Sequence, residues 1–161
     1  MNDKINPIRT TDDEARSLAK TLLRDARFAS LAFTYIPTGG PSVSRIIIAS
    51  IPNQGLVTLI SDLSAHSQAL ALNNRCALLI GEPGKGDPLA HPRMSIIGEA
   101  HRLPEAMKQK ASLVEPFLAM HPKTKLYFNF LDFAFWRFSI ARVDLNGGFG
   151  KAYNLTPNDI D

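Results

Sequence analysis

The chain contains very little cysteine: Cys76 is the single one among 161 residues. An intrachain disulfide is therefore excluded, and the apolar run around it, RCALLI, predicts a buried and unreactive thiol. Metal-binding patterns are also lacking. The histidines are dispersed and lack the close spacing of metal ligands, so no metal site is expected; they are His66, His91, His101 and His121.

Long apolar runs are absent as well. No stretch reaches the roughly 18 apolar residues that a membrane span needs. The N-terminal segment MNDKINPIRTTDDEARS is polar and has no apolar core of a secretion signal. The sequence therefore predicts a protein without a membrane partner, located in the reducing cytoplasm.

Neither sign of charge dominates the sequence, which has 18 basic and 15 acidic residues and a net charge of +3. The basic residues are scattered, with no Lys/Arg run and no interleaving of basic and aromatic surface positions. This balance suits a small phosphorylated ligand and does not call for nucleic acid, which remains a remote alternative.

The length fits one domain, and we expect a single domain over residues 1–161 with a loose N-terminal arm at 1–9. An amphipathic helix is predicted at 11–26, begun by Thr10 or Thr11. Turns rich in Pro, Gly and Asn at 37–41 and 51–55 divide residues 28–61 into three short antiparallel strands.

The second half of the chain continues this pattern. It predicts, in order, a short helix within 61–73, a strand at 75–82, a long loop at 83–92, a strand at 93–103, a helix at 104–122 that Pro116 kinks or divides, a long strand at 132–145 and a terminal turn at 146–153. Six short strands with helices at the margins favour an antiparallel barrel or sandwich over a doubly wound sheet.

One segment has the composition of a phosphate site. Arg45 interrupts an apolar strand, and the next strand runs directly into SDLSAHS, a helix start with three hydroxyls, Ser61, Ser64 and Ser67. Free N–H groups of a first helical turn, hydroxyl donors and a guanidinium fork together bind phosphate well. The alternative is that the serines only cap the helix and Arg45 makes a surface ion pair. His66 is a candidate ligand contact or a structural histidine.

SVSRIIIAS and LVTLISDLSAHSQALALNNRCALLIGE resemble the FMN-binding split-barrel proteins related to pyridoxamine-phosphate oxidase. The resemblance implies an α+β fold with a six-stranded antiparallel split β-barrel and a homodimer with two FMN sites at its interface. Arg45 matches the family's phosphate-binding arginine, and Ser61 and Ser64 match its hydroxyl positions. His66 stands where the oxidase has a lysine, and Ser67 follows on the same turn.

Three further segments resemble the haem-utilisation branch of that family: GEPGKGDPLAHPRMSIIGEA, YFNFLDFAFWRF and GGFGKAY. The likeness makes Lys85, His91, Trp136 and Arg137 candidates around the ring of a cofactor. The alternatives are a simple hairpin loop for the first two residues and core packing for Trp136.

The sequence also departs from the family pattern. Ser50 replaces the lysine that the oxidase has five positions after its strand arginine, and the substrate-side Arg/His pattern of the oxidase is not evident. The further C-terminal domain of longer haem-utilisation proteins is also missing from this sequence. The first two departures argue against pyridoxamine phosphate oxidation itself. Where haem binding depends on the further domain, this chain is not expected to retain it.

The resemblance therefore implies an FMN-binding protein, expected to be a flavin-dependent oxidoreductase acting on a small molecule. The alternatives are a haem-binding or haem-degrading protein and a flavin carrier without turnover. The sequence identifies neither the substrate nor the electron donor.

Overall fold

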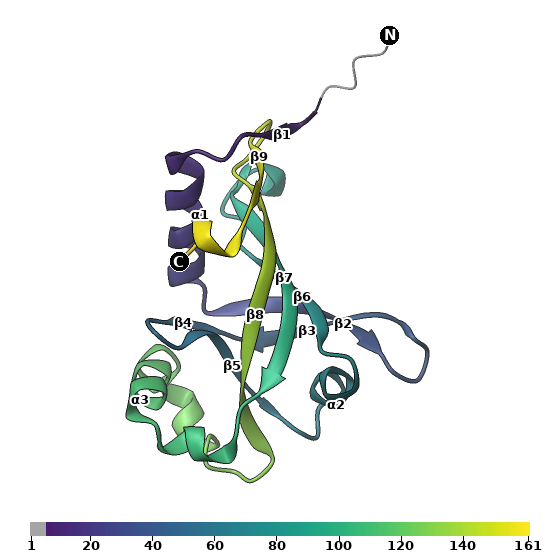
Figure 1. Cartoon of the computed structure of the whole chain (residues 1–161), viewed down its shortest axis with the longest axis vertical. Coiled ribbons are helices and arrows are strands. Elements are labelled where there is room, and N and C mark those ends of the chain that lie inside the picture. The colour runs from purple at the N-terminus through teal and green to yellow at the C-terminus, as the bar shows by residue number, and fades with distance from the viewer. Residues whose placement is uncertain (1–5) are drawn as a thin grey trace.

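The computed structural model describes residues 6–161 (Figure 1). Its α-helices are α1 (Asp13–Asp25), α2 (Ala65–Leu72) and α3 (Ala111–Met120). Its strands are β1 (Ile8–Arg9), β2 (Phe28–Tyr35), β3 (Gly40–Ile47), β4 (Ala49–Ile51), β5 (Gly55–Ser61), β6 (Arg75–Ile80), β7 (Arg93–Arg102), β8 (Phe133–Asn146) and β9 (Ala152–Leu155).

The strands form one sheet in the order β1-β9-β8-β7-β6-β2-β3, to which β5 is joined through β8, and β4 through β5. All pairings are antiparallel except that of β1 with β9. The predicted α+β class is confirmed. The predicted count of six strands is not, because the sheet has nine strands within residues 6–161 and the path through it does not close.

The difference in strand number has local causes. The expected strand at 42–50 is split into β3 and β4 at Ile48, and the expected terminal turn at 146–153 leads into β9. The predicted loose arm at 1–9 is wrong for Ile8 and Arg9, which pair with Ala152 and Tyr153. The first five residues of that arm lie outside the described part of the chain.

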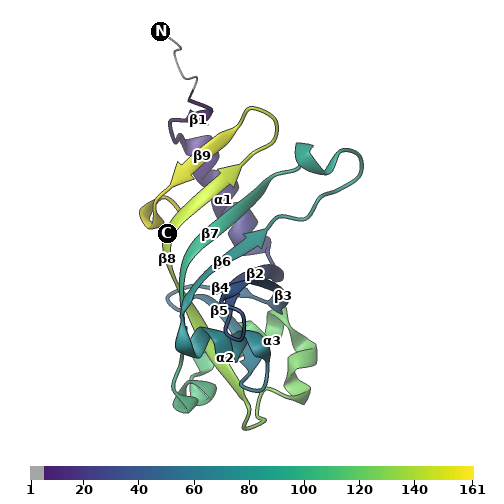
Figure 2. The same ribbon diagram turned by 90° about the vertical axis from the view of Figure 1, so that its right-hand side faces the viewer.

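The long strand β8 organises the sheet. It pairs with β7 along most of its length, whereas its other edge pairs first with β5 and then with β9 (Figures 1 and 2). Its side chains alternate between two apolar cores. Trp136 and Phe138 pack in the larger core with α1, and Phe135 packs in the smaller core with α3.

The helices lie close to where they were predicted. α1 begins after Asp12, whose carboxylate accepts a hydrogen bond of 2.8 Å from the backbone N–H of Ala15, so Asp12 caps the helix instead of Thr10 or Thr11. The expected helix at 104–122 is divided, but the break is at Lys110, whose backbone is extended. Pro116 lies inside α3.

A β-bulge between Ile97 and Gly98 interrupts the pairing of β7 with β8. A Cβ atom at Gly98 would overlap the backbone carbonyl of Ser139 on β8, so only glycine allows this close approach of the two strands.

Within residues 6–161, no helix combines the length and the apolar character needed to cross a bilayer. The cytoplasmic location stays a prediction.

Candidate functional site

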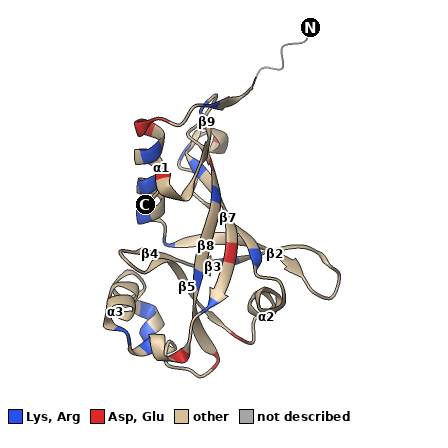
Figure 3. Ribbon diagram, viewed as in Figure 1, with Lys and Arg blue, Asp and Glu red and all other residues tan. Residues whose placement is uncertain are grey.

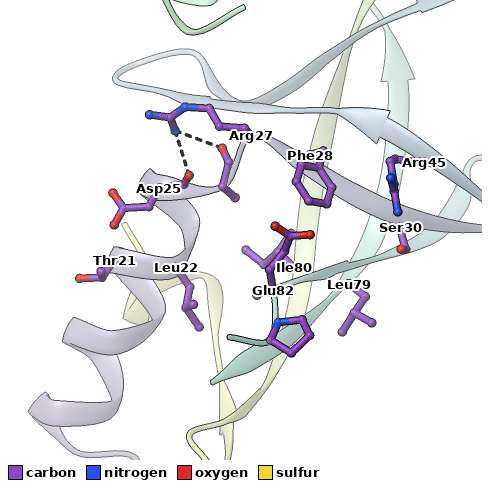
Figure 4. Close-up of a pocket in the computed structure, with 13 residues that line it drawn as sticks. Thr21, Leu22, Asp25, Arg27, Phe28, Ser30, Arg45, Leu79, Ile80 and Glu82 are labelled. Carbon is purple, nitrogen blue, oxygen red and sulfur yellow. Dashed lines mark hydrogen bonds between the residues drawn. The ribbon is translucent and has the colours of Figure 1, made fainter. Parts of the chain in front are cut away.

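A cavity of about 450 Å³ lies where the last turn of α1, the start of β2 and the end of β6 meet (Figure 4). Its walls combine apolar groups with a few charged ones. The lining residues are Thr21, Leu22, Asp25, Ala26, Arg27, Phe28, Ser30, Arg45, Leu79, Ile80, Gly81, Glu82 and Pro83. A mainly apolar hollow with a few polar groups is the usual form of a small-molecule site.

Arg45 enters this cavity from β3. It lies opposite Ser30 of β2, on the outward face of the sheet, because the neighbouring Ile46 points into the core. The Arg45 guanidinium carbon lies 5.3 Å from the centroid of the Phe28 ring, within cation–π range. Within residues 6–161, it has no salt bridge and no hydrogen-bonded acceptor among protein groups, so its N–H donors are available to a ligand.

The other charged groups of the cavity differ from Arg45. The Arg27 guanidinium closes the end of α1, where it donates to the backbone carbonyl of Arg24 at 3.0 Å. It also donates to the carbonyls of Asp25 at 3.0 Å and Ala26 at 3.3 Å (Figure 4). Asp25 forms an ion pair with Arg24 at 2.8 Å. Glu82 is exposed at the start of the β6–β7 loop. Among the described residues, Arg45 is therefore the cation of this cavity that makes no hydrogen bond and no salt bridge, whereas Arg27 uses its Nη1 group to close α1.

The predicted serine cluster forms at the start of α2, but it does not line this cavity. The Ser61 hydroxyl donates to the Asp132 carboxylate at 2.6 Å. Ser64 is the N-cap of α2 and accepts from the backbone N–H of Ser67, whose own hydroxyl donates to the Ser61 carbonyl at 2.6 Å. The structure thus uses the Ser64 hydroxyl as the helix cap, while the hydroxyls of Ser61 and Ser67 donate to other protein groups. Their contact with a phosphate stays a prediction.

His66 lies on the same turn. Its ring is half-buried and meets the Phe33 ring edge-on, with 6.2 Å between centroids. Burial lowers the pKa of His66, since the charged imidazolium loses hydration there. The neutral form is therefore favoured, and His66 resembles a packed structural histidine more than a cation for phosphate.

Lys85 and His91 belong to the β6–β7 loop, which projects beyond the sheet (Figure 2). The His91 Nε2 atom lies 2.9 Å from the backbone carbonyl oxygen of Lys85. Arg93 adds contacts of 3.1 and 3.3 Å to the carbonyls of Leu89 and His91. His91 and Arg93 thus brace this loop, while the Lys85 side chain is exposed. Neither Lys85 nor His91 lines the cavity at Arg45.

Trp136 and Arg137 lie on β8, away from this cavity. Trp136 is 2% exposed within the larger core, and its indole N–H has no hydrogen-bond acceptor within residues 6–161. The Arg137 guanidinium donates to the Gln54 side-chain oxygen at 3.1 Å. This geometry matches the packing interpretation of Trp136, and a ring contact by either residue stays a prediction.

The sequence profile of the family described as "CREG, beta-barrel" matches residues 10–160, nearly the whole chain. The chain belongs to the CREG β-barrel family. A curated relative is the chloroplastic non-canonical heme oxygenase HOZ of Arabidopsis thaliana, 30% identical over 116 residues. These residues are 71% of this chain and 34% of HOZ, so the chain spans about a third of that relative.

Solved structures reproduce the fold. One that is 40% identical matches with a TM-score of 0.84 over 94% of this chain and 98% of its own. A heme-binding protein of Mycobacterium smegmatis, 24% identical, matches with a TM-score of 0.80 over 95% of this chain and 61% of its own.

Two further structures share the fold at lower identity. A pyridoxinephosphate oxidase family protein of Clostridium acetobutylicum is 12% identical, with a TM-score of 0.68 over 94% of this chain and 100% of its own. A FAD-binding protein of Mesorhizobium loti is 18% identical, with a TM-score of 0.61 over 78% of this chain and 88% of its own. The CREG β-barrel family thus shares the predicted split-barrel type of fold.

In this member of the CREG β-barrel family, the sequence pattern indicated Arg45 but not the residues that line the cavity beside it. Phe28, Ser30 and Leu79 join the cavity because β2 pairs with both β3 and β6. The alternation within each strand gives the outward positions, but the register that brings them side by side is set by long-range pairing.

Proposed function

We propose that the chain binds FMN at the cavity beside Arg45 and acts as a flavin-dependent oxidoreductase on a small molecule. The observation that carries the proposal is the Arg45 guanidinium, which makes no hydrogen bond and no salt bridge within residues 6–161 and lies over Phe28 at the edge of the cavity. A guanidinium fork binds a phosphate in bidentate geometry, and its charge is retained at any physiological pH.

The residues present fit this cofactor. Arg45 would hold the phosphate, while Leu22, Phe28 and Leu79 offer apolar surface to the rest of the molecule. When bound, the flavin would supply the redox chemistry, and the protein would position it and exclude water around it. The fold likeness to the FAD-binding protein of Mesorhizobium loti supports a flavin without identifying it.

Haem is the second candidate, and the 30% identity to the heme oxygenase HOZ favours it. Arg45 would bind a carboxylate of haem as well as it binds a phosphate. The cavity, however, is lined by no His, Cys, Met or Tyr, the usual axial ligands of haem iron, among the described residues. The lining therefore fits the anionic edge of haem but not its iron.

An absorption spectrum distinguishes these candidates. The purified protein is incubated with FMN or with haem, desalted and scanned in the visible range. Two flavin bands that stay with the protein support the proposal. A retained Soret band without retained FMN overturns it in favour of haem. A third outcome is that FMN binds but no small-molecule reductant or substrate changes its redox state. That outcome would overturn the proposed oxidoreductase activity and would support the alternative of a flavin carrier without turnover.

We also propose that the protein is a homodimer, in keeping with the family resemblance. Val43 and Leu79 lie on the outward face of the sheet and are 65% and 48% exposed. A second copy that covered these two side chains would remove their apolar surface from water, which favours association. Charged residues of both signs are spread over α1 and the sheet, and the region of α3 carries mostly Lys and Arg (Figure 3).

A further inference from the structure

Four large apolar side chains at one end of the molecule are more than half exposed: Leu63, Leu126, Phe130 and Leu131. The first lies in the turn between β5 and α2, and the others lie at the end of the 3-10 helix Pro122–Leu126 and in the turn before β8. The backbone N–H of Asp62 donates to the Asp132 carbonyl, which joins the two turns. The turn before β8 forms the lower end of the molecule in two perpendicular views (Figures 1 and 2). We name these four residues the apolar tip.

The protein holds the apolar tip in a fixed shape. The buried Lys108 ammonium group donates to the Phe130 carbonyl at 2.9 Å and forms an ion pair with Glu105 at 2.7 Å. Tyr127 and Phe133, which flank the turn before β8, pack against the smaller core with 4.7 Å between their ring centroids. A surface that is ordered before it binds loses less conformational entropy on binding.

Lysines without a protein partner lie directly beside the tip. Lys123 and Lys125 precede Leu126 in the same 3-10 helix, and both are exposed. Within residues 6–161, neither side chain makes a hydrogen bond or a salt bridge. Lys110 and Glu115, next to α3 and on it, are likewise unpaired among the described residues, and their charges offset each other.

The other acidic side chains near the tip are engaged within the protein. Asp62 forms an ion pair with Arg102 at 2.7 Å. The Asp132 carboxylate accepts the hydrogen bond from the Ser61 hydroxyl, and Glu105 is neutralised by the buried ammonium group. The charge left free beside the tip is therefore mainly positive, in line with the excess of Lys and Arg in the region of α3 (Figure 3).

We propose that the apolar tip is a peripheral contact site for a lipid membrane with anionic headgroups. Leu63, Phe130 and Leu131 enter the boundary between headgroups and acyl chains, and Lys123 and Lys125 lie at the charged surface. The sequence predicted no membrane partner because no apolar run is long enough to span a bilayer. A peripheral contact needs no such run, since a few side chains on turns are enough to enter the interface.

The charges favour a membrane over a second copy of the chain. Two copies that met tip to tip would bring their unpaired Lys123 and Lys125 side chains toward one another, and like charges across an interface disfavour association. An anionic lipid surface instead attracts these lysines while the apolar side chains leave water. The tip also lies at the end of the molecule, where a flat surface can reach it.

The test measures partitioning of the full chain onto sedimented vesicles, made either of phosphatidylcholine alone or of phosphatidylcholine with phosphatidylglycerol. The wild-type protein is expected to bind the mixed vesicles more tightly, and added salt should weaken that binding. Lys123→Gln/Lys125→Gln is expected to bind the mixed vesicles more than tenfold more weakly, because each lysine near an anionic surface strengthens binding about fivefold.

Phe130→Ser/Leu131→Ser is expected to weaken binding to both kinds of vesicle at least tenfold, through the loss of apolar surface. The matched control is Leu89→Ser/Phe149→Ser, which makes the same substitutions at exposed positions of the β6–β7 loop and the β8–β9 turn. All four substitutions replace exposed side chains, and unfolding in urea checks that each variant is folded.

Three results would overturn the proposal. The first is a wild-type protein that stays in the supernatant with mixed vesicles at low salt. The second is equal loss of binding in the tip variant and in the control pair. The third is a dimeric wild-type protein that Phe130→Ser/Leu131→Ser converts to single chains, because the tip would then be covered by a second copy.

Discussion

The Arg45 guanidinium lies 5.3 Å from the centroid of the Phe28 ring, although the two residues are on different strands. The contact between a cation and an aromatic face restrains the guanidinium without using its N–H donors. Arg45 is thereby held at the cavity with its hydrogen-bonding capacity intact. A pre-positioned donor loses less entropy when a ligand binds, so this pair is the basis of the proposed anion site.

The serine turn allows a test of capping against phosphate binding. Ser64→Ala removes the N-cap of α2 and is expected to lower the free energy of unfolding by about 1 kcal/mol, measured by urea denaturation. The capping interpretation predicts unchanged FMN affinity, whereas a roughly tenfold weaker FMN complex would show that the hydroxyl reaches the phosphate. Ser139→Ala, at an exposed position of β8, serves as the control.

The bulge on β7 predicts a strict requirement for glycine. Gly98→Ala places a methyl group against the Ser139 carbonyl, so the strands must separate, and we expect a loss of at least ~2 kcal/mol of unfolding free energy. Gly40→Ala is the control, because its Cβ would come no closer than 3.4 Å to the Thr38 hydroxyl oxygen. Equal stability of the two variants would contradict the close approach of β7 and β8.

Cys76 is expected to be inert in the native protein. Burial, and to a lesser extent the charge of Glu99, raise the pKa of its thiol to about 12. The thiolate is the reactive form, and its fraction falls tenfold for each unit by which the pKa exceeds the pH. Alkylation by iodoacetamide at pH 8 should therefore be slow in the native state and fast after unfolding in urea. The structure buries Cys76 only in part, unlike the fully buried thiol that the sequence predicted. Rapid alkylation of the folded protein would contradict the protection that this partial burial gives.

The homodimer proposal predicts a mass in solution of twice the 17.7 kDa chain, measured by size-exclusion chromatography with light scattering. Val43→Asp places a charge on the outward sheet face and should shift the mass to that of one chain, because burying an unpaired carboxylate is costly. Leu72→Asp, on the exposed side of α2, should leave the mass unchanged. A monomeric wild-type protein would contradict the proposal.

Local sequence patterns predicted most of the elements, since each depends on nearby residues. The turns at 37–41 and 51–55 bound β2, β3 and β5, and Ser64 begins α2. The patterns did not predict β1, because a two-residue strand has no periodicity. Its pairing with β9 joins Ile8 to Ala152 from opposite ends of the chain. Such pairings follow from the assembled core and are not encoded in a local window.

The site was predictable only in part for the same reason. Arg45 was recognised because a charge interrupts an apolar strand. Phe28 and Leu79, its neighbours in the cavity, have no local feature that links them to it. The serines of α2 gave an ambiguous signal, since the residues that cap a helix are also those that bind phosphate at its N-terminus.

The most direct test of the central claim is the dissociation constant of FMN for the wild-type protein and for Arg45→Ala. The matched control is Arg75→Ala, an exposed arginine of β6 that does not line the cavity. Loss of a charged phosphate contact should cost about 1.5–3 kcal/mol, so Arg45→Ala should bind FMN ten- to more than a hundredfold more weakly, with Arg75→Ala close to wild type. Equal FMN affinity of the wild type and Arg45→Ala would contradict the assignment of the site.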